Sequence, residues 1–216
     1  MAIVLFGSPG SGKGTQAKML THCLGVPHIS TGDMLRDRIK EGDGLPTKVA
    51  ETMHSGALVC DDVINAMVAE RLSQPDAVKG FILDGYPRTL AQAETLISWL
   101  SARKIREVVI HLAVDYNIII ARLTGRRQCP RCGTLYNVAS HPPKVDGVCD
   151  LDGTNLVIRD DDREEVIRER LEAYERQTRP VLEFFRKSGH RVVRVDASVD
   201  PPQAVHEKIC QVMESA

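Results

Sequence analysis

The sequence predicts an α/β fold in which a five-stranded parallel sheet is flanked by helices on both faces. Two observations support this class. Short apolar runs recur along the chain, and each is followed by a polar or glycine turn and then by a longer stretch of helical character. The first apolar run also leads directly into a glycine-rich loop. Together they predict a three-layer P-loop fold.

Five apolar runs supply the expected strands. Four are Ala2–Phe6, Phe81–Leu83, Val108–Val114 and Val192–Val195. A shorter run, Val26–Ile29, could supply the fifth, because a strand buried on both faces need not alternate with polar residues.

The stretches that follow these runs predict helices. Their ranges are Gly12–Leu24, Asp61–Leu72, Leu90–Arg103, Tyr116–Leu123, Glu164–Lys187 and Pro201–Met213. Pro180 is expected to kink or divide the fifth of them, because proline lacks the backbone N–H and clashes with the preceding turn.

Two segments interrupt the alternation of strands and helices. Ser30–Val59 indicates two short helices, and Gly125–Asp162 is rich in Gly, Pro, Cys and Asp. We interpret both as insertions into a single core.

Composition narrows the class of protein. The chain has 216 residues, 43% of them hydrophobic, which is enough for one sizeable core with small inserted units. No window approaches the roughly 20 consecutive apolar residues of a membrane-spanning helix. Lys and Arg total 28 against 29 for Asp and Glu, so no general nucleic-acid or membrane surface is indicated. We expect a soluble cytoplasmic monomer.

The glycine-rich loop reads GSPGSGKGT from Gly7 to Thr15 and is placed between a strand and a helix. In that context glycines let backbone N–H groups surround a phosphate, and Lys13 supplies a mobile positive charge. Gly14 occupies the place of the usual Ser or Thr, so direct Mg²⁺ ligation by the loop is not expected. Asp84, at the end of a strand, is the candidate for holding Mg²⁺ through water.

Four blocks occur in order along the chain: GSPGSGKGT, STGDMLR at 30–36, DGYPRT at 84–89 and an arginine-rich stretch at 122–127. With them the chain resembles the adenylate kinase family over essentially its whole length. The resemblance implies a CORE at 1–29, 60–124 and 163–216, an AMP-binding insertion at 30–59 and a long LID at 125–162. It also implies the reaction Mg-ATP + AMP ⇌ 2 ADP, so that ATP, AMP and ADP are the expected partners.

By the same resemblance, two arginines, Arg36 and Arg88, grip the AMP phosphate, because guanidinium geometry matches phosphate oxygens. Gln92 is expected to select adenine, since an amide can both donate to and accept from its edge. The full set of residues expected at AMP is Thr31, Arg36, Leu58, Val59, Gly85, Arg88, Gln92, Arg159 and Arg170.

On the donor side, Arg122 resembles the arginine that stacks on the ATP base. The expected ATP-binding residues are Gly10, Ser11, Gly12, Lys13, Gly14, Thr15, Arg122, Arg126 and Val199. The expected catalytic residues are Lys13, Asp84, Arg88, Arg126, Arg159 and Arg170. Cations stabilise the dispersed charge of phosphoryl transfer, and an ionised monophosphate needs no catalytic base. The seven histidines are therefore left out of this set. Asp161 and Asp162 resemble an acidic pair of the family near the hinge of the LID, but Asp160 stands where a basic residue can occur, so this pair is left out as well.

Within 125–162 the spacing is Cys129-x2-Cys132, sixteen residues, then Cys149-x2-Asp152. Two paired-ligand turns at this separation match a structural zinc ribbon, and zinc-bearing members of the family can have a carboxylate as fourth ligand. His141 and Asp150 are alternatives for that fourth place, and iron or cobalt for the metal. The isolated Cys23, Cys60 and Cys210 are expected to be small buried hydrophobes.

Two rival functions stay open on the sequence. One is a kinase for another monophosphate, which Gln92 and the long LID disfavour. The other is a nucleotide sensor or zinc-ribbon nucleic-acid binder that transfers no phosphate, which Lys13, Arg88 and Arg126 disfavour.

Overall fold

The computed structural model of the chain describes residues 1–42 and 47–214. Its centre is a five-stranded sheet in the order β2-β3-β1-β4-β7, with every neighbouring pair parallel. The strands are β1 Ala2–Phe6, β2 His28–Ser30, β3 Phe81–Asp84, β4 Glu107–Ala113 and β7 Val192–Asp196. The predicted fold class is confirmed.

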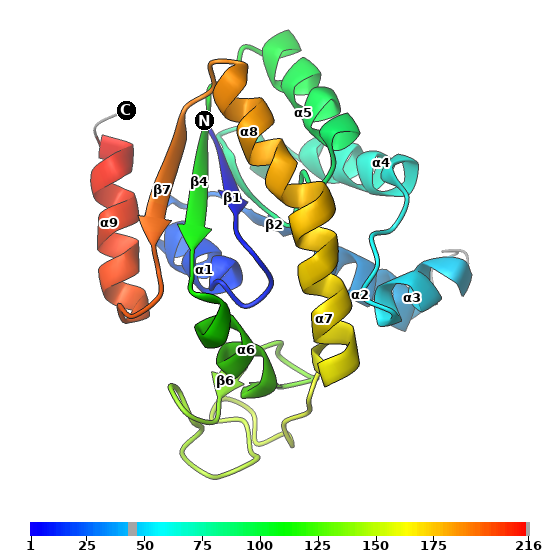
Figure 1. Ribbon diagram of the computed structural model, residues 1–216, viewed down its shortest axis with the longest axis vertical. Helices are drawn as coiled ribbons and strands as arrows, with labels where there is room; N and C mark the ends of the chain where they lie inside the picture. Colours follow the sequence, from blue (N-terminus) through cyan, green and yellow to red (C-terminus); the bar gives the residue numbers. More distant parts are fainter. Residues whose placement is uncertain (43–46, 215–216) are drawn as a thin grey trace.

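Helices cover both faces of this sheet (Figure 1). These helices are α1 Lys13–Leu24, α4 Asp61–Leu72, α5 Leu90–Ala102, α8 Arg179–Lys187 and α9 Pro202–Glu214, and a short 3₁₀ turn, η1, lies at Pro75–Ala77. Two further helices, α6 Tyr116–Thr124 and α7 Glu164–Ala173, pack against each other near the carboxyl ends of the strands (Figure 1). Because side chains alternate along a strand, β1 contributes to two cores. Val4 and Phe6 pack in a core with α4, α5 and α8, while Ile3 and Leu5 pack in another with α1 and α9.

The predicted long helix over 164–187 is divided, as expected from Pro180. A π-helical turn, η3 at Tyr174–Thr178, separates α7 from α8, and Pro180 lies in the first turn of α8. Proline is tolerated there because the N–H groups of a first turn have no partner within the helix.

The two interruptions of the α/β alternation form separate structures beside the sheet. The first contains α2 Thr31–Glu41 and α3 Thr47–His54; residues 43–46 of the predicted 30–59 unit lie outside the described residues. The second contains the antiparallel pair β5 Arg126–Gln128 and β6 Leu135–Asn137 and ends at a 3₁₀ turn, η2 Asp160–Asp162. No helix within 1–42 and 47–214 is long and apolar enough to span a bilayer.

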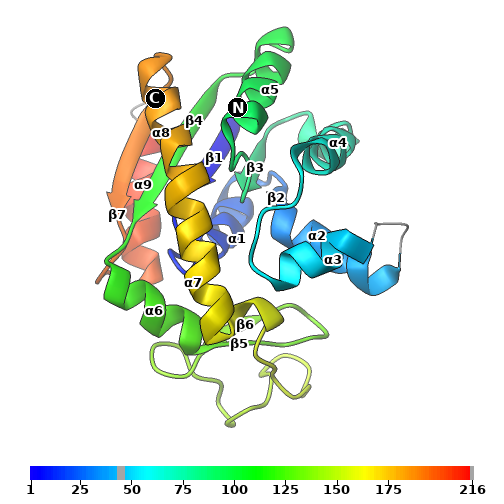
Figure 2. The ribbon, with the colours of Figure 1, turned by 45° about the vertical axis from the view of Figure 1, so that its right-hand side comes forward.

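Both structures lie near the carboxyl ends of the central strands (Figures 1 and 2). The register aligns these ends, since Asp84 pairs with Leu5 on one side and with Ser30 on the other. The chain reverses its direction of winding around β1, which lies between β3 and β4. Such a switch point leaves a crevice at the carboxyl ends, where α/β proteins bind ligands.

Candidate functional site

The glycine-rich loop joins β1 to α1 at this edge of the sheet. Gly10 and Gly12 have φ angles of 80° and 93°, in the left-handed region that favours glycine. A Cβ on Gly10 would also lie 2.9 Å from the Leu123 side chain. The first turn of α1, which begins at Lys13, has backbone N–H groups without helical partners and a partial positive charge. Loop and helix terminus together can bind an anion.

Lys13 folds back over this loop. Its Nζ donates hydrogen bonds to the carbonyls of Gly7, at 2.8 Å, and Ser8, at 3.0 Å. Burial lowers the pKa of Lys13 to about 8, which Asp84 opposes and Arg88 and other nearby arginines reinforce. The ammonium is therefore mostly protonated at neutral pH, and a bound phosphate would raise its pKa again.

Asp84 ends β3 opposite the loop. Its Oδ2 lies 3.3 Å from His28 Nε2, and a Cβ on Gly14 would be 3.6 Å from the same oxygen. Burial opposes ionisation of Asp84, but the His28 hydrogen bond and the charge of Lys13 outweigh it, so its pKa is lowered. An ionised carboxylate beside the phosphate loop is the ligand type that Mg²⁺ and its water shell prefer.

Two neighbouring carboxylates hold arginines from distant parts of the chain. Arg126, on β5, donates from both Nε and Nη2 to Asp162, with Nε 2.6 Å from Oδ2. Arg170 Nη1, on α7, lies 3.0 Å from Asp162 Oδ1 and 3.2 Å from Asp161 Oδ2. Arg36 Nη1, on α2, lies 3.6 Å from Asp161 Oδ2. The acidic pair therefore links α2, β5 and α7.

Two further arginines, Arg88 and Arg159, lie near these charged side chains. Burial lowers the pKa of Arg88 to about 10, reinforced by Arg170, and that of Arg159 to about 10, reinforced by Arg126. Arg159 Nε donates to Gln128 Oε1 at 2.6 Å. Both guanidiniums stay charged at neutral pH, and the concentration of positive charge favours a ligand with several phosphates.

A second set of residues meets around Gly85, directly after β3. The Gly85 carbonyl accepts from Thr31 Oγ1 at 2.8 Å and from Arg88 Nε at 2.9 Å. A Cβ here would lie 2.9 Å from both side chains, at a φ of 78°, so the close approach requires glycine. Gln92 Oε1 accepts from the Arg88 backbone N–H at 2.8 Å. Four of the residues expected at AMP are therefore linked through hydrogen bonds.

The remaining nucleotide-binding candidates have varied surroundings. Val59 is buried in the core on the α4 and α5 side, and Leu58 is half-buried. Arg122, on α6, donates from Nη2 to the carbonyls of Ala197, at 2.8 Å, and Ser198, at 3.1 Å. Val199, the next residue, is 86% exposed. Of the loop residues, Ser11 is buried and Thr15 is exposed.

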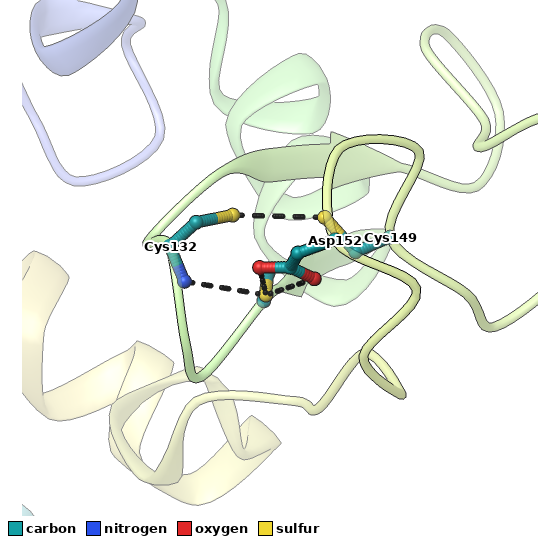
Figure 3. A group of neighbouring side chains, drawn as sticks. Cys132, Cys149 and Asp152 are labelled. Atoms are coloured by element: carbon teal, nitrogen blue, oxygen red, sulfur yellow. Dashed lines mark hydrogen bonds between the residues drawn. The ribbon is translucent and has the colours of Figure 1, made fainter.

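The structure brings Cys129, Cys132, Cys149 and Asp152 together, with their potential ligand atoms all within 4.8 Å of one another. Cys132 Sγ is 3.6 Å from Cys149 Sγ, and Cys129 Sγ is 3.3 Å from an Asp152 oxygen. Figure 3 shows the side chains of Cys132, Cys149 and Asp152 facing one another. Three thiols and one carboxylate at this spacing suit a tetrahedral cation such as Zn²⁺.

The two turns that carry this group have the same hydrogen-bond pattern. The Cys129 and Cys149 N–H groups each donate at 2.9 Å to a threonine carbonyl five residues later. Their carbonyls each accept at 3.0 Å from glycines, Gly133 and Gly153, whose φ angles are 69° and 71°. The repeated turn shows that Asp152 stands where the first turn has Cys132.

The alternative fourth ligands have other contacts. The His141 ring stacks on Tyr136, with centroids 5.9 Å apart, and Asp150 Oδ1 accepts from the Lys144 N–H at 2.8 Å. Neither belongs to the group of potential metal ligands found in the described part of the chain. The structure therefore favours Asp152.

Comparison with known proteins identifies the family. A family model described as "Adenylate kinase" matches residues 5–190. The chain belongs to the adenylate kinase family. A protein named "Adenylate kinase" from Thermosipho melanesiensis is 47% identical over 209 residues, covering 96% of this chain and 97% of that one. Those of Geobacillus sp. and Thermodesulfovibrio yellowstonii, named likewise, are 50% identical over 191 residues (88% of each chain) and 45% over 215 residues (99% of each).

The acidic partners in this adenylate kinase are a feature that sequence reasoning undervalued. Asp161 and Asp162 stand outside the predicted catalytic set, yet they contact three of the arginines expected at the phosphates. The signal was present as three consecutive aspartates that follow Arg159. What the sequence did not show is which of the three is buried.

The expectation that the isolated cysteines are buried was wrong for two of them. Cys23, in the last turn of α1, and Cys60, just before α4, are exposed. Both lie at helix ends, where the chain faces solvent. Cys210 is partly buried and its Sγ lies 3.5 Å from His206 Nε2.

Proposed function

We propose that this adenylate kinase catalyses Mg-ATP + AMP ⇌ 2 ADP by direct in-line transfer between the two nucleotides. The observation that carries the proposal is the convergence of Lys13, Arg88, Arg126, Arg159 and Arg170 at the carboxyl edge of the sheet. Arg126 and Arg170 share Asp162, and neighbouring arginines lower the pKa of Lys13, Arg88, Arg159 and Arg170. Positioned cations stabilise the dispersed negative charge of phosphoryl transfer.

Each nucleotide has its own group of residues. We assign the ATP phosphates to the loop Gly10–Thr15 with Lys13 and Arg126, and the ATP base to the region of Arg122 and Val199. We assign AMP to Thr31, Arg36, Leu58, Val59, Gly85, Arg88 and Gln92, with Arg159 and Arg170 between the two phosphates. The AMP phosphate, with a second pKa of about 6, is already ionised enough to attack, so no side chain needs to remove a proton.

Asp84 is the residue we assign to the water shell of the Mg²⁺ that accompanies ATP. The metal would neutralise charge on the phosphates. The Asp84 carboxylate fits this role because the protein keeps it ionised, beside Gly14.

Residues 125–162 form the LID in this proposal, and residues 30–59 form the AMP-binding unit. Both close over the nucleotides and exclude water, which suppresses hydrolysis of ATP. Cys129, Cys132, Cys149 and Asp152 hold a structural Zn²⁺ in the LID, since four protein ligands leave no position for a catalytic water. The LID has a small apolar cluster, Cys129, Tyr136 and Cys149 with Leu156 against it, so a metal cross-link would add stability. The cytoplasmic location and the monomeric state stay predictions.

A coupled assay of phosphate transfer from Mg-ATP to AMP, UMP, CMP and GMP, with metal content measured on the same preparation, tests the proposal. We expect AMP-selective turnover and about one zinc per chain. Preference for another monophosphate would contradict the assignment of the base pocket, and the absence of any transfer would favour a nucleotide sensor.

A further inference from the structure

Asp61, the first residue of α4, contacts the residue assigned to the AMP base. Its Oδ1 accepts from Gln92 Nε2 at 2.7 Å, and its Oδ2 accepts from Thr89 Oγ1 at 2.8 Å. Thr89 in turn caps α5 by accepting from the Gln92 backbone N–H at 3.2 Å. Asp61 therefore contacts both the side chain of Gln92 and the residue that starts its helix.

The other end of the Gln92 amide is also held. Gln92 Oε1 accepts from the Arg88 backbone N–H at 2.8 Å. An ionised carboxylate can only accept a hydrogen bond, and a backbone N–H can only donate one. If the amide turned over, its oxygen would face the Asp61 carboxylate and its NH₂ would face the Arg88 N–H. Both contacts would be lost, and Gln92 is only 2% exposed, too little for water to replace them.

One orientation of the amide has a chemical consequence. A primary amide has two N–H groups and two acceptor sites, so Gln92 keeps one of each after contacting Asp61 and Arg88. On adenine a 6-amino donor stands beside the N1 acceptor. The Gln92 oxygen can accept from the 6-amino group while the Gln92 N–H donates to N1. A 6-oxopurine such as hypoxanthine offers the reverse, an acceptor beside an N1–H donor, and would need the amide to turn over.

We propose that Asp61 is a positioning residue for base selection, which fixes the Gln92 amide in the orientation that fits adenine and thereby excludes 6-oxopurine monophosphates. The proposal rests on the proposed function, in which Gln92 reads the AMP base. In this proposal Asp61 acts through Gln92 without contacting the nucleotide. Its contact with Gln92 explains why the enzyme would reject a 6-oxopurine monophosphate, which has almost the same shape as AMP.

The test compares kcat/KM for AMP and for inosine monophosphate (IMP) in the wild type and in Asp61→Asn. An asparagine can face Gln92 with either its oxygen or its NH₂, so it tolerates both orientations of the amide. We expect the AMP-to-IMP ratio to fall by about tenfold, corresponding to one lost hydrogen bond. The KM for AMP should rise and the KM for ATP should not change. Because both substrates are measured on one preparation, the ratio does not depend on how much of the variant is folded.

Asp62→Asn is the matched control. Asp62 is exposed in the same first turn of α4, so its replacement removes a similar helix-terminal charge without altering the contact with Gln92. We expect it to keep the wild-type ratio. If Asp61→Asn also keeps that ratio, even with a lower melting temperature, Asp61 has only a structural role and the proposal is overturned.

Gln92→Leu separates this inference from the proposed function. A collapse of the ratio in Gln92→Leu with no change in Asp61→Asn would overturn only the positioning role of Asp61. An unchanged ratio in Gln92→Leu would show that the base is read elsewhere, and a wild type that transfers no phosphate to AMP would overturn the proposed function itself.

Discussion

Replacing Asp162 with asparagine would remove a charge that two arginines share. The Asp162 side chain is 0% exposed, and those of Arg126 and Arg170 are 16% exposed, so these are not surface ion pairs. Breaking a buried pair from one side costs about 3–5 kcal/mol, because the remaining charge stays buried without its partner. Asp161 still contacts Arg170 and asparagine can still accept hydrogen bonds, so we expect the lower figure, about 3 kcal/mol.

That loss is measurable by thermal unfolding. For a chain of this size each kcal/mol lowers the melting temperature by about 2–4 °C, so Asp162→Asn should melt about 6–12 °C below the wild type. Asp160→Asn is the control in the same turn. The Asp160 side chain is 72% exposed, and its contact with His54 is a 3.6 Å ion pair, so we expect a change within about 0.5 kcal/mol.

The same pair of variants tests whether the arginines form the phosphate site. With Asp162 neutralised, Arg126 and Arg170 repel each other more strongly, and a phosphate-rich ligand should relieve that repulsion. We therefore expect ADP to raise the melting temperature of Asp162→Asn more than that of the wild type. Equal melting temperatures for Asp162→Asn and Asp160→Asn would refute the stability argument. If ADP raised the melting temperatures of these two variants equally, the link to phosphate binding would be refuted.

Three other predictions concern the loop, the LID and the turn after β3. The pKa of Lys13 is lowered to about 8, so kcat/KM should fall as pH rises through about 8, and Lys13→Arg should remove that step from the pH profile. In the unfolded chain Lys13 keeps its proton up to its ordinary pKa near 10.5, so between about pH 8 and 10.5 this group makes the free energy of unfolding rise with pH. A free energy of unfolding, measured by urea titration, that falls over this pH range would contradict the burial of Lys13. Chelation of the metal, or Cys149→Ser, should release zinc and raise the rate of proteolysis within 125–162 more than within the sheet, whereas equal rates would argue against a structural metal. Gly85→Ala should raise the KM for AMP at least about tenfold, because its Cβ would lie 2.9 Å from Thr31 Oγ1 and Arg88 Nη2, and a KM unchanged from the wild type would place AMP elsewhere.

The sequence was sufficient for the sheet because buried parallel strands have an apolar pattern of their own. The weakest of these predictions, the strand at Val26–Ile29, shows the limit: the observed strand is His28–Ser30, two residues later at its start. Pro27 has no N–H to donate to the ladder, while Ser30 pairs with Asp84 and also caps α2 by accepting from Asp33 N–H at 3.3 Å. Hydrogen-bond pairing, not hydrophobicity, sets that boundary.

For the candidate site, the sequence was enough to predict the lysine and the arginines, but not which carboxylates form ion pairs with them. Asp160, Asp161 and Asp162 are identical in type and adjacent, yet their side chains are 72%, 13% and 0% exposed. Only the fold distinguishes them, because η2 directs Asp162 toward Arg126 and Arg170 and leaves Asp160 in solvent. Asp61 lies in none of the motifs, since the role of a residue that acts through a partner depends on where that partner lies.

The acidic pair also explains how so much positive charge can be assembled before a nucleotide binds. Arg36, Arg126 and Arg170 would repel one another, and burial already lowers the pKa of Arg170, while Asp161 and Asp162 act to raise it. Arg88 and Arg159 have their pKa lowered further by neighbouring arginines, so neutralisation by the pair is incomplete. The phosphates of two nucleotides would supply the missing negative charge. The incompletely neutralised arginines therefore lower the stability of the free enzyme and at the same time favour the binding of phosphate. Variants that add a carboxylate beside Arg88 should gain stability and lose affinity for AMP.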